Sequence, residues 1–332
     1  MSWVLGKDGT AAEVMNEQTP ASKGAGCSAT GSRLHAGAQL NQLEPENAMP
    51  TLEETRSASK HKLRQMKTSL GTLDGALVAF SAGVDSTFLL AVAREMLGER
   101  VIALTALSPS MPQAEREEAR ELARRLGVRH VEVESHELAD PRYAANPVDR
   151  CFYCKDELFR LCLEVARREG AAAVLDGFNA DDKRDHRPGH RAARERAVKS
   201  PLAEAGLTKD EVRAWSEAYG LPTWNKPQMA CLASRLPYGT PVTTERLAQI
   251  EGAEGTLRAL GLRSFRVRHH GDIGRIEVAE DELEHAFARR AELAAALRAV
   301  GFKLAVLDLE PFRSGRLNDL AGLAPSSRGQ AQ

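Results

Sequence analysis

Two kinds of hydrophobic pattern alternate along residues 51–200 of this 332-residue chain. Short continuous apolar runs predict buried strands, and apolar residues three or four positions apart predict helices. The predicted strands cover residues 76–80, 101–107, 128–134 and 172–175, and the predicted helices cover residues 85–97, 112–126 and 154–169. Apolar strands that alternate with amphipathic helices indicate a parallel sheet covered on both faces. We therefore expect residues 51–200 to form a Rossmann-like α/β domain.

A second and smaller α/β unit is predicted over residues 240–316. Its pattern indicates a helix at 243–260, strands at 264–269 and 275–279 joined by a Gly-Asp-Ile-Gly turn, a helix ending near 300, and a strand at 303–309. His269 and His270 border that turn and are predicted to be exposed hairpin residues, with metal binding as the alternative. Residues 201–239, between the two units, contain a connecting helix and a proline-rich loop around Cys231.

The two ends of the chain lack a periodic pattern. Residues 1–50 are rich in small and polar side chains, which predicts a disordered extension, with Met49 as an alternative start. Residues 317–332 are predicted to form a flexible tail.

Composition narrows the class of protein. Hydrophobic residues make up 42% of the chain, which is enough for a core, and the formal net charge is −1. A chain so close to neutrality has no overall field that would attract nucleic acid or an anionic membrane. No apolar run approaches the roughly 20 residues that span a bilayer. The five cysteines are an odd number in a chain of this length, which argues against a secreted disulfide framework and favours a cytoplasmic protein.

A short polar loop connects the first predicted strand to an apolar helix. Its residues are Ser81, Ala82, Gly83, Val84, Asp85, Ser86 and Thr87. A turn from a strand into a helix directs free backbone N–H groups and the positive end of the helix at one point, which suits a phosphate. Asp85 is expected either to cap the helix or to face a Mg²⁺ ion. The alternative is a capped turn that binds no ligand.

The loop has neither a Walker nor a dinucleotide-binding signature, because it lacks both a Gly-Lys-Ser/Thr ending and a G-x-G-x-x-G pattern. It resembles the PP-loop of enzymes that cleave ATP between its α and β phosphates, whose pattern is Ser-Gly-Gly-x-Asp-Ser. Ala82 replaces the first glycine, which is unfavourable if the position needs a positive φ. Asp176 and Gly177, at the end of the fourth predicted strand, are expected to form a second edge facing the nucleotide.

Three cysteines suggest metal or sulfur chemistry. Cys151 and Cys154 form a C-x-x-C motif that opens a predicted helix, where the helix end favours a lowered thiol pKa. Together with Cys231 they suit a [4Fe–4S] cluster with one open iron, or a zinc site completed by His or water. Cys162 lies inside an amphipathic helix and is predicted to be a buried core residue.

Charged residues after the fourth predicted strand are candidates for substrate and metal binding. Arg187 and Arg191, together with Arg235 beside Cys231, are predicted to hold a substrate phosphate or carboxylate. Glu195 and Glu204 are candidate Mg²⁺ ligands along with Asp85. The alternative for the charges at 181–199 is a solvated helix.

Several stretches together resemble the LarE family, the ATP-dependent sacrificial sulfur transferases. The matching stretches are residues 80–87, 150–155, 175–182, 200–208, 226–243 and 307–315, within a resemblance that covers roughly 51–316. It implies a PP-loop ATP pyrophosphatase domain and an enzyme that uses ATP with Mg²⁺. The implied reaction adenylates a carboxylate of pyridinium-3,5-biscarboxylic acid mononucleotide and converts it to a thiocarboxylate. This chemistry belongs to biosynthesis of the nickel-pincer nucleotide, the cofactor of lactate racemase.

The resemblance also bears on the sulfur source and on partners. Some family members sacrifice the sulfur of one cysteine, and others use a sulfide on a [4Fe–4S] cluster held by three cysteines. Cys151, Cys154 and Cys231 match the second type. We expect a small-molecule substrate and a homo-oligomer, without a nucleic-acid or membrane partner.

Three other functions remain as alternatives. A PP-loop tRNA thiolase can also carry three cysteines, but it needs a basic RNA-binding surface, which the neutral charge does not favour. A nucleotide-binding protein with a structural zinc site would bind ATP without releasing pyrophosphate. An amide-forming PP-loop ligase would not need the three cysteines.

Overall fold

The computed structural model describes residues 50–184, 188–228, 230–313, 315–320 and 322. Residues 1–49 of the predicted extension, the greater part of the predicted tail and Arg187 lie outside the described residues. No helix in the described segments is long and apolar enough to cross a membrane.

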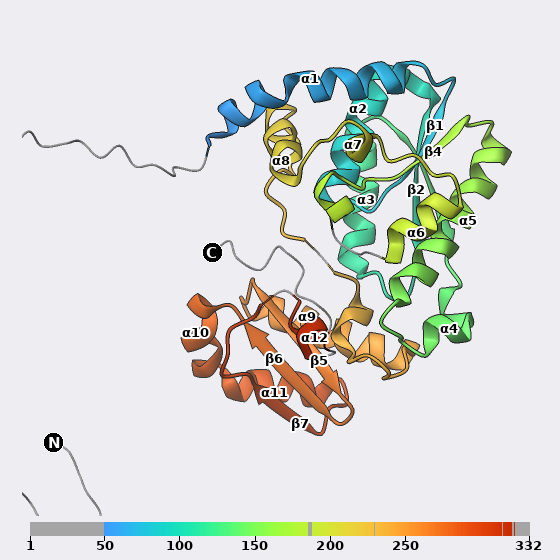
Figure 1. Cartoon of the computed structure of the whole chain (residues 1–332). Coiled ribbons are helices and arrows are strands. Elements are labelled where there is room, and N and C mark those ends of the chain that lie inside the picture. The colour runs from blue at the N-terminus through green and yellow to red at the C-terminus, as the bar shows by residue number, and fades with distance from the viewer. Residues whose placement is uncertain (1–49, 185–187, 229, 314, 321, 323–332) are drawn as a thin grey trace, which may run out of the picture. The chain divides into compact units, whose positions relative to one another are not determined.

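The first domain is built on a four-stranded sheet in the order β3-β2-β1-β4 (Figure 1). Every pairing in this sheet is parallel, which confirms the predicted architecture. The strands are β1 (Ala76–Ala79), β2 (Val101–Leu107), β3 (Arg129–Glu134) and β4 (Ala173–Leu175). The main helices are α1 (Leu52–Gly71), α2 (Val84–Leu97), α3 (Gln113–Arg125), α5 (Arg150–Glu169) and α6 (Pro188–Glu195), with the short α4 (Pro141–Ala144) before α5.

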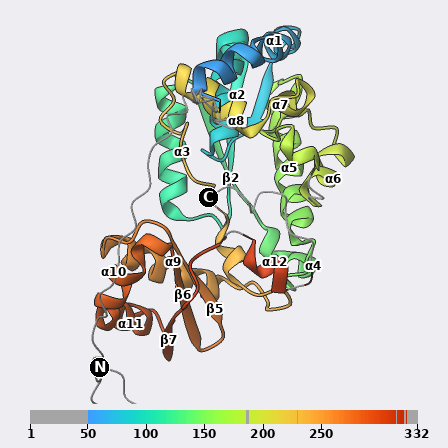
Figure 2. The same cartoon turned by 60° about the vertical axis from the view of Figure 1, so that its left-hand side comes forward.

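Helices cover both faces of this sheet because successive residues of a strand point to opposite faces. Ala76 and Val78 of β1 pack in a core with α1, α2 and α3. Leu77 of the same strand packs in a separate core with α5 and α6. Figure 2 shows α3 and α5 on opposite sides of β2. β1 lies between β2 and β4, so the carboxyl ends of β1 and β4 are neighbours.

Two helices connect this domain to the C-terminal part of the chain. They are α7 (Pro201–Glu204) and α8 (Lys209–Ala218), followed by a loop and the short 3-10 helix η4 (Leu232–Arg235). Thr208 and Glu211 form a capping box at the start of α8, since each side chain bonds to the backbone N–H of the other.

A three-stranded sheet in the order β5-β6-β7 forms the core of the C-terminal part. β5 and β6 pair antiparallel, and β6 and β7 pair parallel. The strands are β5 (Phe265–His270), β6 (Ile273–Val278) and β7 (Leu304–Leu307), and the helices are α9 (Thr244–Ala259), α10 (Leu283–Ala288), α11 (Arg290–Ala299) and α12 (Arg316–Leu320). The single helix predicted to end near 300 is therefore two helices.

His269 is buried, so the prediction of an exposed hairpin residue is wrong for this position. Alternation along β5 places Phe265, Val267 and His269 on the same face. Phe265 and Val267 belong to the core under α9 and α11. The His269 ring packs edge-on against Phe302, with the ring centroids 5.2 Å apart.

Candidate active site

The phosphate loop, residues 81–87, wraps around the side chain of Ser86. The hydroxyl of Ser86 accepts a hydrogen bond from the backbone N–H of Ser81 at 3.3 Å and donates to the carbonyl of Gly83 at 3.3 Å. The two serine hydroxyls are 3.2 Å apart. Gly83 is the N-cap of α2 in an extended conformation and has no side-chain cap. The helix end therefore presents its backbone N–H groups without an internal side-chain acceptor, as a phosphate site requires.

Ala82 adopts the left-handed conformation that favours glycine, with φ 55°. Its side chain is fully buried in the core beneath α2. The left-handed region brings Cβ close to the backbone carbonyl and costs an alanine roughly 1–2 kcal/mol. The loop thus keeps the backbone shape that a glycine would adopt more easily.

Gly177 brings the end of β4 against the phosphate loop. A Cβ atom at this position would lie 3.0 Å from the backbone N of Ser86 and 3.2 Å from its Cα. Real Cβ atoms rarely come so close to backbone, so the approach requires glycine. The end of β4 thus lies beside the phosphate loop, and its role as a second edge facing the nucleotide stays a prediction.

Asp176, immediately before Gly177, is a buried carboxyl group with one free oxygen. Its Oδ1 accepts a hydrogen bond from the backbone N–H of Phe178 at 3.1 Å. Its Oδ2 and the buried hydroxyl of Thr87 have no hydrogen-bond partner of good geometry among the described residues, although the Ser200 side chain is close enough to the carboxyl group to lower its pKa. Burial raises the pKa of Asp176 to about 6. Buried polar atoms without partners are costly in a finished core, and they fit a site that is completed by a polar ligand.

Asp85 already has two partners from distant parts of the chain. Asn179 donates to Oδ1 at 3.0 Å, and the Lys209 ammonium lies 2.5 Å from Oδ2. A second ammonium, that of Lys226, donates to the carbonyl of Ala82 at 3.2 Å. Sequence reasoning missed Asn179, Lys209 and Lys226, because no local pattern links them to the loop.

The structure brings the three candidate cysteines into one region. Cys151 is exposed in the first turn of α5, and Cys154 and Cys231 are half-buried in the same apolar cluster beside Tyr143. Arg150 connects the two segments: its guanidinium donates to the carbonyl of Ala233 at 2.9 Å and lies 4.0 Å from the Cys231 sulfur.

Desolvation by surrounding protein atoms raises the pKa of both thiols in the C-x-x-C motif, although the Cys151 residue as a whole is exposed. The expectation of lowered thiol pKa values is therefore wrong for Cys151 and Cys154. For Cys151, the next cause that raises the pKa is the neighbouring Cys231. For Cys154 the pKa is raised by burial, by the Glu137 carboxylate and by Cys231. Thiolates that disfavour one another in this way need a positive charge to coexist. A bound metal centre would supply that charge, because it converts thiols to thiolates.

Within the described ranges, no three His, Cys, Asp or Glu side chains are grouped to hold a metal ion. Glu195 is an exposed partner of Arg191 at 3.6 Å. Glu204 accepts a hydrogen bond from the backbone N–H of Ser200 at 3.0 Å. Mg²⁺ binding by Asp85, Glu195 and Glu204 therefore stays a prediction.

The two described arginines among the predicted substrate ligands have different surroundings. Arg191 is exposed, and its guanidinium lies 3.8 Å from the ring centroid of Phe152 at the start of α5. Arg235 is fully buried and donates to both carboxylate oxygens of Glu254 at 2.9 Å. It also donates to the carbonyls of Ala230 and Cys231. In this structure Arg235 supports the backbone of the Cys231 loop.

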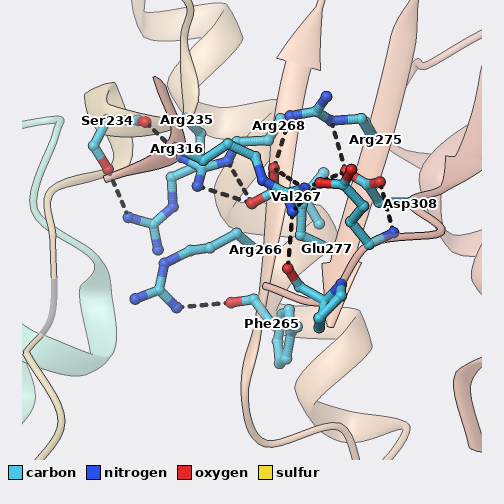
Figure 3. A network of polar contacts seen from close by, with 12 residues as sticks. Ser234, Arg235, Phe265, Arg266, Val267, Arg268, Arg275, Glu277, Asp308 and Arg316 are labelled. Atoms are coloured by element: carbon cyan, nitrogen blue, oxygen red, sulfur yellow. Dashed lines mark hydrogen bonds and ion pairs between the residues drawn. The ribbon is translucent and has the colours of Figure 1, made fainter. Parts of the chain in front are cut away.

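A second charged network, which sequence reasoning missed, lies on the C-terminal sheet (Figure 3). Arg268 and Arg275 share the buried carboxylate of Glu277 across β5 and β6, at 2.8 and 2.7 Å. Arg268 also donates to the carbonyl of Ser234 at 2.9 Å, so the sheet contacts the residue before Arg235. Burial, followed by the charge of Arg235, lowers the pKa of Arg266 to about 10.

Comparisons with known proteins agree on one kind of domain and one set of relatives. Residues 75–269 match the asparagine synthase family, whose domain is of the PP-loop type. An uncharacterized protein of Synechocystis sp. is 43% identical over 259 residues, covering 77% of this chain and 97% of that protein. The pyridinium-3,5-bisthiocarboxylic acid mononucleotide synthase of Lactiplantibacillus plantarum is 38% identical over 259 residues, covering 78% of this chain and 94% of that protein.

Proposed function

This chain belongs to the LarE family of PP-loop proteins, and from that membership we propose that it is an ATP-dependent sulfur transferase. Its substrate is pyridinium-3,5-biscarboxylic acid mononucleotide, and its product carries a thiocarboxylate in place of a carboxylate. The product is a precursor of the nickel-pincer nucleotide. The relative from Lactiplantibacillus plantarum carries the name of the matching synthase.

The observation that carries this proposal is that one chain combines a candidate phosphate edge with a candidate cysteine site. The phosphate loop and the end of β4 form an edge with unpartnered polar atoms. Cys154 of α5 and Cys231 pack against the same apolar cluster, and the guanidinium of Arg150, the residue before Cys151, lies 4.0 Å from the Cys231 sulfur. ATP pyrophosphatases need the first site, and sulfur transfer needs the second.

The chemistry follows from the poor reactivity of a carboxylate, whose leaving group would be oxide. In the first step a substrate carboxylate oxygen bonds to the α-phosphorus of ATP, and pyrophosphate leaves with the electron pair of the broken P–O bond. The N–H groups of residues 81–87 are placed to hold the phosphates and to offset the charge that develops on pyrophosphate. In the second step sulfur bonds to the acyl carbon and AMP leaves with the electron pair of the broken C–O bond.

We propose that Cys151, Cys154 and Cys231 hold a [4Fe–4S] cluster. When bound, the cluster would supply a sulfide as the nucleophile. The three side chains contribute thiolate ligands, and Arg150 and Lys155 offset part of their charge, since both lower the pKa of Cys151. The alternative is a single cysteine that gives up its own sulfur.

The decisive experiment separates activation from sulfur transfer in a Cys231→Ala variant. Adenylation does not use the thiol, so the variant should still release pyrophosphate when the pyridinium substrate is added. It should form no thiocarboxylate, because the nucleophile cannot be held without its third ligand. Anaerobically purified wild-type protein should contain iron and sulfide, which Cys231→Ala should lose.

Cys162→Ala is the matched control. This buried thiol lies in the core of α5, and burial raises its pKa to about 12, so its loss should leave thiocarboxylate formation intact. Wild-type thiocarboxylate formation by Cys231→Ala would contradict the proposed role. Absence of iron, with a mass loss of about 34 Da at one cysteine after turnover, equal to one H₂S, would assign the reaction to a sacrificed thiol.

A further inference from the structure

Lys155 on α5 differs from the other partly buried lysines in the described part of the chain. Each of the others places its ammonium 2.5–2.6 Å from a Glu or Asp carboxylate: Lys62, Lys67, Lys209 and Lys226. Lys155 is also half-buried, but it forms no ion pair with a described residue. Withdrawing an ammonium from water without an anionic partner costs free energy. The absence of a carboxylate partner for Lys155 among the described residues therefore indicates that its ammonium pairs with the anion of a bound ligand.

The side chain of Lys155 packs against aromatic rings and the backbone of a neighbouring helix. Its ammonium lies 5.8 Å from the ring centroids of both Phe159 and Phe178. Phe178 is itself fixed by stacking on His190 at 3.8 Å. A Cβ atom on Gly189 would lie 3.1 Å from Cγ of Lys155, so the stem is packed as well. Aromatic faces attract a cation but carry no net charge, so the positive charge is held in place without being neutralised.

Lys155 lies between the cysteines and the nucleotide edge of the sheet. It follows Cys154 directly in α5, and its ammonium lies 5.8 Å from the ring centroid of Phe178, two residues after Asp176. The charge of this ammonium acts on Asp176 at the end of β4. The residue after Asp176 packs against the backbone of Ser86 in the phosphate loop.

The other two ammonium groups near the phosphate loop are already neutralised. Lys209 pairs with Asp85. Lys226 pairs with Glu115 at 3.0 Å and with Glu118 at 2.6 Å. Recruiting either one to a phosphate would require an existing ion pair to break, whereas Lys155 has none to lose.

We propose that Lys155 forms an anion subsite for the α-phosphate of the bound adenine nucleotide. The inference rests on the proposed function, because the α-phosphate is the group that takes part in both steps. It is attacked by the carboxylate in the first step and leaves as part of AMP in the second. An ammonium on the side of the cysteines offsets negative charge on this group throughout.

The test measures the affinity of the whole protein for AMP and for adenosine by isothermal titration calorimetry. Lys155→Met should weaken AMP binding roughly 10- to 100-fold, which is the value of a hydrogen bond to a charged group. Adenosine binding should not change, because adenosine has no phosphate. Lys155→Arg should recover part of the AMP affinity. Lys60→Met removes the same charge from an exposed position on α1 and should change neither affinity.

Three outcomes would overturn the subsite. In the first, Lys155→Met binds AMP as the wild type does. In the second, the affinities for AMP and adenosine fall together, as expected if Lys155 only supports the fold. In the third, the variant loses affinity for inorganic pyrophosphate and keeps that for AMP. None of these measurements uses the pyridinium substrate or sulfur, so failure of the proposed sulfur transfer would be seen separately, in the thiocarboxylate assay.

Discussion

The phosphate loop and the Cys231 loop are held in place in different ways. The phosphate loop runs directly from β1 into α2, and its internal hydrogen bonds join residues three to five positions apart. The Cys231 loop is held by distant residues: the carbonyl of Ser110 accepts from the N–H of Leu232, Arg150 reaches Ala233, and Glu254 pairs with Arg235. A phosphate loop can thus be specified within one short segment, whereas the candidate cysteine site forms only after the chain has folded.

The largest effect is expected from breaking the support of the Cys231 loop. Arg235→Met would leave the Glu254 carboxylate buried without its cation, which typically costs 3–5 kcal/mol. Thiocarboxylate formation should fall with stability, because the same guanidinium holds the carbonyls of Ala230 and Cys231. Denaturant unfolding measures the first effect, and a product assay measures the second.

A double variant and a surface variant serve as controls for this prediction. Arg235→Met combined with Glu254→Gln removes both charges and should recover part of the lost stability. Arg124→Met breaks an exposed pair with Glu121 and should have little effect. If Arg235→Met loses activity while its free energy of unfolding stays at the wild-type value, Arg235 acts on the substrate and not on the loop.

The same difference between local and long-range contacts explains which features of the fold and the site could be predicted from the sequence. The strands and helices around the phosphate loop follow from continuous apolar runs and helical spacing, and the structure confirms the parallel sheet. The approach of Gly177 to Ser86 was predictable as well, because the carboxyl ends of parallel strands meet at one edge.

The remaining contacts had no local signal. Lys209 reaches Asp85 across 124 positions, and Arg150 reaches Ala233 across 83. Nothing in the spacing of single charged residues indicates such pairs. The raised pKa values of Cys151 and Cys154 were missed for a related reason. A helix end is visible in the sequence, but the burial that outweighs it comes from tertiary packing.

A second prediction concerns Asp176, the buried charge at the phosphate edge. Its pKa of about 6 lies above the ordinary value of 3.8. Between these two pH values the folded protein binds a proton that the unfolded chain has released. Its stability therefore falls as the pH rises through this window, by roughly 3 kcal/mol at 1.36 kcal/mol per pKa unit. Asp176→Asn removes the titration and should be more stable than the wild type at pH 7.

Unfolding measured from pH 4 to pH 7.5 checks this sign. The difference between Asp176→Asn and the wild type should grow with pH and level off above about 6.5. The exposed Asp74, as Asp74→Asn, should show no comparable change. A constant difference across the range would show that the carboxyl is ionised throughout in the folded protein.

The smallest effect is expected at Ala82, where the phosphate loop departs from the glycine of the PP-loop pattern. Ala82 and Ala197 have nearly the same left-handed φ, 55° and 54°. Glycine at either position relieves roughly 1–2 kcal/mol of strain and costs about 0.5–1 kcal/mol in chain entropy. Only the buried Ala82 also loses a methyl contact worth about 0.8 kcal/mol.

Ala197→Gly should therefore stabilise the protein by about 0.5–1 kcal/mol, while Ala82→Gly should leave the free energy of unfolding near the wild-type value. ATP affinity of Ala82→Gly should stay within about threefold, or roughly 0.6 kcal/mol, since the loop already has the conformation that glycine would adopt. Equilibrium unfolding and ATP titration of the two variants check both statements. A gain at Ala82 that equals the gain at Ala197 would show that the buried methyl contributes nothing. Burial of that methyl would then no longer explain how a phosphate loop accepts alanine at a strained position.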